Sequence, residues 1–225
     1  MMYSAGKDIV GKKLAITELQ KFISSHLKSN LPIKVTKRQN DPKQKRGLPY
    51  LGGAYYSHYD KANHKRYIEI VLSYHPLDEK IRLTEYRWQS MCSLFADTIL
   101  HEIIHMRQYR ARNFKFIPGY ESTAHYVKDQ REQEYYGHRD EMGAFAFNIA
   151  CEMISRFGND HRAIQKYMDS MKCKRHPKST YNQYLKAFDY NHNHNIIRRM
   201  KKKILNQLDN AVIGKPFRTS DYLTY

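Results

Sequence analysis

Apolar residues recur at helical spacing in several parts of the chain, and the longest of these stretches is Trp88–Arg112. It contains neither Pro nor Gly, and its apolar positions include Met91, Leu94, Phe95, Ile99, Ile103 and Met106. Because side chains three and four residues apart share one face of a helix, the pattern predicts a helix over Thr84–Arg112, continuous or in two pieces. Leu14–Leu27 carries a similar apolar stripe and predicts a second helix.

Strand-like runs lie between these two helices. Arg66–Tyr74 is rich in β-branched and aromatic residues, and Gly53–His58 is a second such run. The polar segment Asp60–His64 separates them, so we predict a β-hairpin. Leu31–Val35 predicts a short strand, and the polar, basic segment Thr36–Gly47 predicts an exposed loop.

The chain beyond the long helix has mainly helical patterns. Asn113–Arg139 is aromatic and charged, with a turn expected at Pro118–Gly119. Asp140–Phe157 predicts a helix with Asp140 as its N-cap and Gly158 as its end. Further helices are expected at Asp160–Met171, Thr180–Phe188 and Asn195–Leu208. Strands followed by helices predict an α+β fold with a small sheet and a helical C-terminal extension.

The charge balance points to an anionic partner. The 225 residues carry a formal net charge of +17, with a pI of about 9.7. Such an excess favours binding to nucleic acid, an anionic surface or an acidic protein. Three clusters supply much of this charge: Arg198, Arg199, Lys201, Lys202 and Lys203; Lys172, Lys174, Arg175 and Lys178; and Lys37, Arg38, Lys43, Lys45 and Arg46. Tyr181, Tyr184 and Tyr190 lie between the first two clusters in the sequence and could stack on bases.

Composition also indicates the compartment. Met1–Val10 is mixed and polar, so no signal peptide is expected, and no apolar stretch is long enough to span a membrane. Cys92, Cys151 and Cys173 are widely spaced and form no C-x-x-C pair. We therefore expect a reducing, cytoplasmic location, no membrane association and no disulfide framework.

The pentapeptide H-E-I-I-H, at residues 101–105, carries the chemistry of the predicted long helix. His101 and His105 are one helical turn apart, so both imidazoles can bind one metal ion. Zn²⁺ accepts imidazole nitrogen readily and, with one further protein ligand, keeps a position open for water. Glu102 could then act as a general base towards that water. This is the zincin signature, and its chemistry is metal-assisted hydrolysis.

The third protein ligand has to come from elsewhere, and Glu141 is the preferred candidate. It opens a helix in which Gly143, Ala144 and Ala146 are small, so that this helix could approach the metal helix closely. His138 and His125 are alternatives that would give a three-His site. Four other residues are considered for a role in the chemistry. Tyr135 or Tyr136 could donate a hydrogen bond to the oxyanion formed on a carbonyl substrate. His192 and His194 are expected to be solvated turn residues.

The H-E-I-I-H motif, followed about three dozen residues later by Y-Y-G-H-R-D-E-M-G-A-F-A, resembles a group of metallopeptidase-like proteins encoded by bacteriophages. The resemblance covers about Leu94–Cys151 and implies a gluzincin-type zincin with Glu141 as third ligand. For a phage protein it implies the host cytoplasm. SprT-like proteases, which act on DNA-bound proteins, are more distantly similar; they use a third His in a Gly-rich loop, faintly matched by Gly137-His138.

Together these observations predict a zinc-dependent metallopeptidase that hydrolyses protein or peptide substrates. We expect a zincin-like catalytic domain over residues 1–158 and a basic helical extension over residues 159–225. In a zincin, the edge strand of the sheet lies beside the cleft and can pair with extended substrate. The rival hypothesis is a nucleic-acid-binding protein on a zincin-like scaffold, with a structural metal or lost catalysis.

Overall fold

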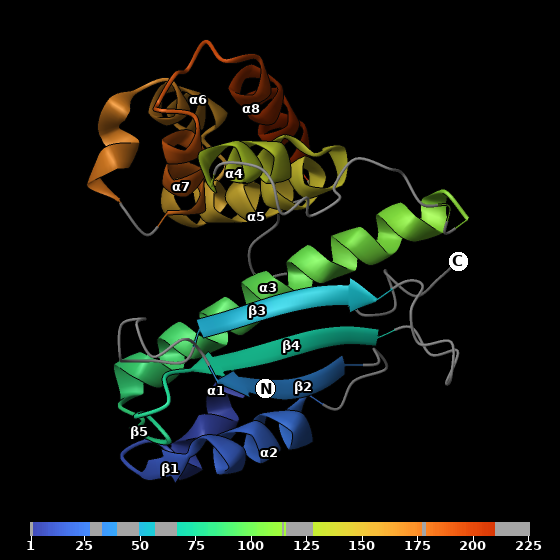
Figure 1. Cartoon of the computed structure of the whole chain (residues 1–225). Coiled ribbons are helices and arrows are strands. Elements are labelled where there is room, and N and C mark those ends of the chain that lie inside the picture. The colour runs from blue at the N-terminus through green and yellow to red at the C-terminus, as the bar shows by residue number, and fades with distance from the viewer. Residues whose placement is uncertain are drawn as a thin grey trace. The chain divides into compact units, whose positions relative to one another are not determined.

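The computed structural model describes residues 2–27, 33–39, 50–56, 67–113, 115, 128–176 and 179–209. The chain forms two compact units, residues 1–114 and residues 115–225 (Figure 1). The described part of the first unit contains helices and strands, and that of the second contains helices only. The α+β class expected from the sequence is therefore confirmed.

The first unit holds two small sheets and the long helix. Its elements are α1 (Met2–Ala5), η1 (Gly6–Asp8), β1 (Lys13–Ala15), α2 (Ile16–His26), β2 (Ile33–Gln39), β3 (Tyr50–Tyr56), β4 (Tyr67–Tyr74), β5 (Lys80–Arg82) and α3 (Glu85–Ala111). β1 and β5 form an antiparallel pair, and the other three strands form a sheet in the order β2-β4-β3. The long helix is a single piece.

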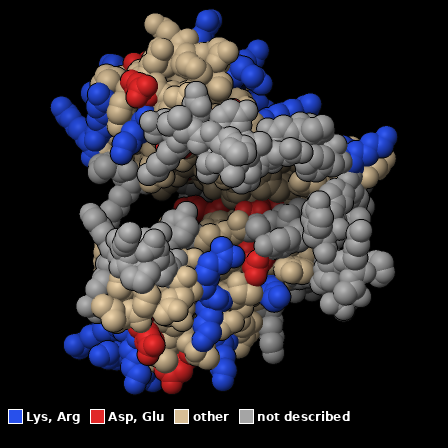
Figure 2. All heavy atoms as spheres, in the orientation of Figure 1, with Lys and Arg blue, Asp and Glu red and all other residues tan. Residues whose placement is uncertain are grey.

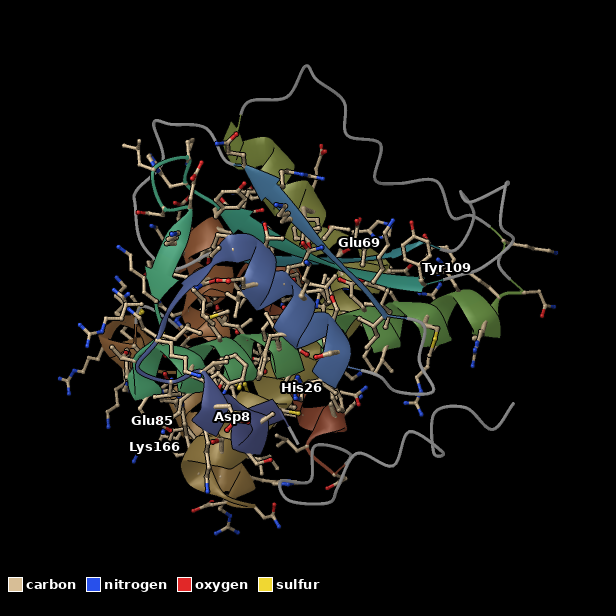
Figure 3. The ribbon with its side chains drawn as sticks, turned by 90° about the horizontal axis from the view of Figure 1, so that it is seen from below. Asp8, His26, Glu69, Glu85, Tyr109 and Lys166 are labelled. Atoms are coloured by element: carbon tan, nitrogen blue, oxygen red, sulfur yellow. The ribbon has the colours of Figure 1, made fainter. Side chains whose placement is uncertain are left out.

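The three-stranded sheet mixes the two pairing directions. β3 runs antiparallel to β4, with Gly53 opposite Ile70, which confirms the predicted hairpin pairing. The expected turn between them lies outside the described residues. β2 runs parallel to β4 on the other side, and the Thr36 hydroxyl donates to Glu69 Oε1 across this pair at 2.9 Å. Glu69 of β4 is labelled in Figure 3. β3 is thus an edge strand of the described sheet.

One face of this sheet carries the core of the first unit. Alternate residues of β4 are fully buried, as period-two geometry requires: Ile68, Ile70 and Leu72. Helix α2 contributes buried Leu19 and Ile23, and α3 contributes buried Trp88, Met91 and Phe95. Phe22 and Trp88 meet edge to face with their ring centroids 5.8 Å apart, so α2 and α3 pack together over this core.

Two boundaries in this unit differ from the prediction. The helix expected at Leu14–Leu27 begins at Ile16, because the Ala15 N–H donates to Glu18 Oε2 at 2.7 Å and the preceding residues pair with β5. Residues 36–39 extend β2 instead of opening a loop, because they pair with residues 71–74 of β4. The rest of the expected loop lies outside the described residues.

The second unit is a helical bundle around α5. Its elements are α4 (Lys128–Gly137), α5 (Arg139–Phe157), α6 (His161–Met168), η2 (Met171–Arg175), α7 (Thr180–Ala187) and α8 (Asn195–Gln207). Helix α5 contacts each of the other four α-helices of this unit. Their shared core includes Met142, Ile149, Met153, Tyr181, Tyr184, Ile197, Met200 and Ile204. Side chains of Asp160 and Ser179 cap α6 and α7.

The start of α5 departs from the prediction. The α5 N-cap is His138, whose Nδ1 accepts from the Asp140 N–H at 3.4 Å, while Asp140 lies inside the helix. Gly158 ends this helix as predicted, with φ of 59°. The compact units divide at residue 114, and helix α5 packs with the helices that follow it. The catalytic domain and basic extension expected on either side of residue 158 stay a prediction.

Helix α4 was not expected from the sequence. Its polar run gives no apolar stripe, and the helix is held instead by single contacts. The Gln133 side chain donates to the Ala187 carbonyl at 2.9 Å, and the Tyr136 ring meets Tyr184 with centroids 4.9 Å apart. Among the described helices, none is both long enough and apolar enough to cross a membrane.

Candidate metal centre

The second half of α3 presents two imidazoles to one point. His101 and His105 are one turn apart, and their Nε2 atoms lie 3.1 Å from each other. Two nitrogens bound to one tetrahedral zinc at about 2.0–2.1 Å lie about 3.3–3.4 Å apart, so the pair matches a shared ion within roughly a few tenths of an ångström. Both side chains are buried, at 9% and 8% exposure.

A hydrogen bond orients the second imidazole. His105 Nδ1 lies 2.9 Å from Gln108 Oε1, one helical turn further along α3. An amide oxygen can only accept, so Nδ1 carries the proton and Nε2 keeps its lone pair. This is the tautomer that a metal ligand needs, and an outer partner of this kind commonly fixes it. The neutral Gln108 was not recognised from the sequence, although its spacing from His105 is visible there.

Glu102 is held against the edge strand β3. Its side chain is only 4% exposed. A Cβ built on Gly53 of β3 would lie 3.1 Å from both Cγ and Oε1 of Glu102, and 2.4 Å from Thr98 Cγ2. The strand can approach α3 this closely only because Gly53 has no side chain. The carboxylate predicted to be the general base is therefore pressed against the backbone of an edge strand.

Glu141 belongs to the second unit. It is half-buried and lies in the first turn of α5, as predicted. Its carboxylate, like the imidazoles of His101 and His105, is a donor of the kind that zinc accepts. The alternative ligand His138 caps α5 through Nδ1, and His125 lies outside the described residues. The assignment of Glu141 as a ligand stays a prediction.

The tyrosines predicted to have functional roles are mostly structural. Tyr181 and Tyr184 are fully buried, so the prediction that they stack on bases is wrong. Burial raises the pKa of both hydroxyls. The Tyr181 hydroxyl donates to the Met168 carbonyl at 2.7 Å, and the Tyr184 hydroxyl donates to the Tyr136 carbonyl. The ring of Tyr136 packs on Tyr184 and Phe145. Tyr135 lies edge-on to Phe145 and is half-buried.

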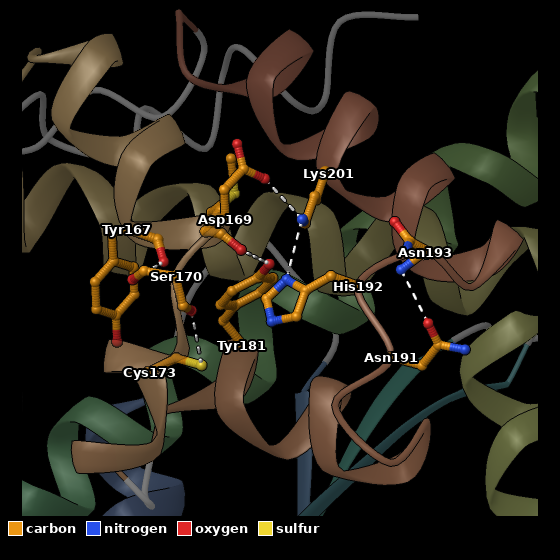
Figure 4. A network of polar contacts seen from close by, with 10 residues as sticks. Tyr167, Asp169, Ser170, Cys173, Tyr181, Asn191, His192, Asn193 and Lys201 are labelled. Atoms are coloured by element: carbon orange, nitrogen blue, oxygen red, sulfur yellow. Dashed lines mark hydrogen bonds and ion pairs between the residues drawn. The ribbon is translucent and has the colours of Figure 1, made fainter.

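The histidine-rich turn before α8 also has structural contacts. His194 Nδ1 accepts from the Ile196 N–H at 3.3 Å and caps α8. His192 Nδ1 lies 3.1 Å from Lys201 Nζ, which also pairs with Asp169 at 2.7 Å (Figure 4). Burial lowers the pKa of His192, and the charge of Lys201 lowers it further. Within the described residues, neither histidine belongs to a possible metal-binding group.

In comparisons with protein-family models, curated proteins and solved structures, no match to this chain was found.

Proposed function

We propose that the protein is a zinc-dependent hydrolase of peptide bonds. The observation that carries the proposal is the arrangement on one turn of α3. Two buried imidazoles face each other at 3.1 Å, and the buried carboxylate of Glu102 follows the first of them in the chain. A solvated helix in which these residues are incidental would not keep all three side chains below a tenth exposed.

The residues suit zinc in both number and chemistry. His101 and His105 would bind it through Nε2, since Gln108 keeps the proton of His105 on Nδ1. Glu141 would supply the third protein ligand. Two imidazoles and one carboxylate leave a coordination position open, as hydrolytic zinc sites require. When bound, zinc would supply Lewis acidity and lower the pKa of a water molecule.

Glu102 would carry the proton through the reaction. Its carboxylate accepts a proton from the attacking water as the new C–O bond forms at the scissile carbonyl. It then delivers this proton to the amide nitrogen as the C–N bond breaks, so that a free amine leaves. The position beside β3 fits this role, because the close approach of the strand at Gly53 leaves Glu102 little room to move.

Substrate would bind as an extended strand. β3 pairs with β4 on one side, and in the described sheet its other side has no partner strand. An extended peptide can add to such an edge through backbone hydrogen bonds. Because a Cβ at Gly53 of β3 would lie only 3.1 Å from Glu102, a peptide bound at this strand would pass close to the carboxylate. This arrangement favours a protein or peptide substrate over a small ester.

Glu102→Gln tests the proposal. The amide keeps the shape of the side chain but cannot accept the proton, so cleavage of denatured casein should fall by at least 100-fold, as expected for loss of a general base. Bound zinc, measured by mass spectrometry of the purified protein, should remain near one per chain. Glu85→Gln, in the first turn of the same helix, is the matched control and should cleave like the wild type. Equal cleavage by wild type and Glu102→Gln would contradict the mechanism. Full zinc content without cleavage by the wild type would favour the structural-metal hypothesis.

A further inference from the structure

The outward face of α8 carries a cluster of exposed cations. Arg198, Arg199 and Lys202 are exposed, and no ion pair is found for them among the described residues. Arg198 and Lys202 are one turn apart, so the three side chains share a face. The opposite face, with Ile197, Met200 and Ile204, is buried in the core of the unit. The position of these cations is therefore fixed by the packing of the helix.

A second basic segment adjoins this helix. Lys172, Lys174 and Arg175 of η2 are exposed. Lys201 of α8 pairs with Asp169, two residues before η2 begins, which ties the two segments together (Figure 4). Residues 160–209 contain twelve Lys and Arg but only four Asp and Glu. Lys and Arg side chains accordingly project from the helical unit in Figure 2. The two segments form one basic surface, which we call the α8–η2 surface.

We propose that the α8–η2 surface binds double-stranded nucleic acid through its backbone phosphates, without reading sequence. Guanidinium groups match the oxygens of a phosphate, and contacts from Arg and Lys to phosphate need no particular base. This proposal does not depend on the metal centre.

The aromatic residues of this region favour a duplex over a single strand. Proteins that hold single strands stack bases on exposed aromatic rings. Here Tyr181 and Tyr184 are fully buried. Tyr190 is half-buried, with Lys174 Nζ 4.2 Å from its ring centroid. None of these three rings is therefore available to stack on a base. A surface that contacts phosphates alone suits a duplex, whose bases are already stacked on each other.

The packing of α8 disfavours a membrane as the partner. A helix that binds a lipid surface inserts its apolar face between the headgroups. The apolar face of α8 is already used in the core. The described outward positions of α8 are Asn195, Arg198, Arg199, Lys202 and Asn206, none of which is apolar. Attraction to anionic lipid would be purely electrostatic, without insertion.

The test compares two triple variants of the full chain. The first replaces Arg198, Arg199 and Lys202 with Gln; the control replaces Lys7, Lys12 and Lys21, which are exposed in the first unit, and removes the same charge. Binding to a fluorescein-labelled 30-base-pair DNA duplex of random sequence is measured by anisotropy between 50 and 200 mM NaCl. Each phosphate contact contributes a factor of roughly 8 at 0.1 M salt relative to 1 M salt. The α8 variant should therefore bind at least tenfold more weakly, with a salt slope shallower by about 2 to 3.

The control variant should lose clearly less affinity and keep most of the slope. Circular dichroism should be unchanged, because the α8 side chains are exposed. An equal loss in both variants would overturn the proposal and attribute binding to net charge alone. So would tighter binding of a matched single strand, or binding of phosphatidylserine vesicles without binding of the duplex.

Discussion

Gly53→Ala tests the close approach between β3 and α3. The new Cβ would lie 2.4 Å from Thr98 Cγ2, whereas carbon atoms pack at about 3.5–4.0 Å, so strand and helix must separate by about 1 Å or Thr98 must leave its rotamer. Overpacking of this kind costs about 1–3 kcal/mol in free energy of unfolding. With a urea m-value of about 2 kcal/mol/M, the unfolding midpoint should fall by about 1 M.

The fluorescence of Trp88 reports this transition, because it is the single tryptophan of the chain and is buried in the core of the same unit. Thr98→Ser supplies the matched control, since it removes the methyl group that the new Cβ would meet first. The double variant should regain most of the lost stability, because the remaining 3.1 Å contacts with Glu102 need only a small adjustment. An unchanged midpoint in Gly53→Ala, or the absence of any rescue by Thr98→Ser, would refute the argument.

Three further outcomes are expected. Glu141→Ala should lower zinc content sharply in equilibrium dialysis while His138→Ala and His125→Ala keep it; the reverse result would support a three-His site. Gln108→Leu should weaken zinc binding by about 10- to 100-fold, because it removes the hydrogen-bond partner of His105. Gln89→Leu on the same helix is the control and should leave zinc binding unchanged. Equal zinc affinities of the two variants would contradict the role of Gln108 in fixing the His105 tautomer. In a variant with Cys92 and Cys151 replaced by Ser, Cys173 should react with Ellman's reagent at pH 8 only when urea unfolds the chain. Burial raises the pKa of the Cys173 thiol, so little thiolate is present in the folded protein. Rapid reaction of the folded protein would contradict this.

Strong periodicity made much of the fold predictable. The helix containing His101, the β3–β4 pairing and the helices α5 to α8 follow from apolar spacing. Helix α4 has no such stripe, and its place depends on contacts from residues as distant as Ala187. The pair β1–β5 is three residues long and joins segments more than sixty residues apart, so no local pattern announces it.

The side chains of the candidate site could be named from the sequence, but the contacts that hold them could not. H-E-I-I-H identified the two imidazoles and the carboxylate between them. The contact of Gly53 with Glu102 joins residues 49 positions apart, and spacing along the chain cannot reveal it. His138 caps the helix where Asp140 was expected, because an imidazole nitrogen can also accept a hydrogen bond from a backbone N–H. Burial of Tyr181 and Tyr184 depends on the packing of the whole bundle.

The strand order β2-β4-β3 has a consequence for the sequence of folding events. Tyr56 and Tyr67 pair across β3 and β4 at a separation of 11 residues, whereas Ile33 and Ile68 pair across β2 and β4 at a separation of 35. Closing the longer loop costs about 1 kcal/mol more chain entropy. The hairpin should therefore form first and present β4 as a template, on which β2 docks in parallel. Substitutions at the β3–β4 pair should then slow refolding, while those in β2 should mainly speed unfolding.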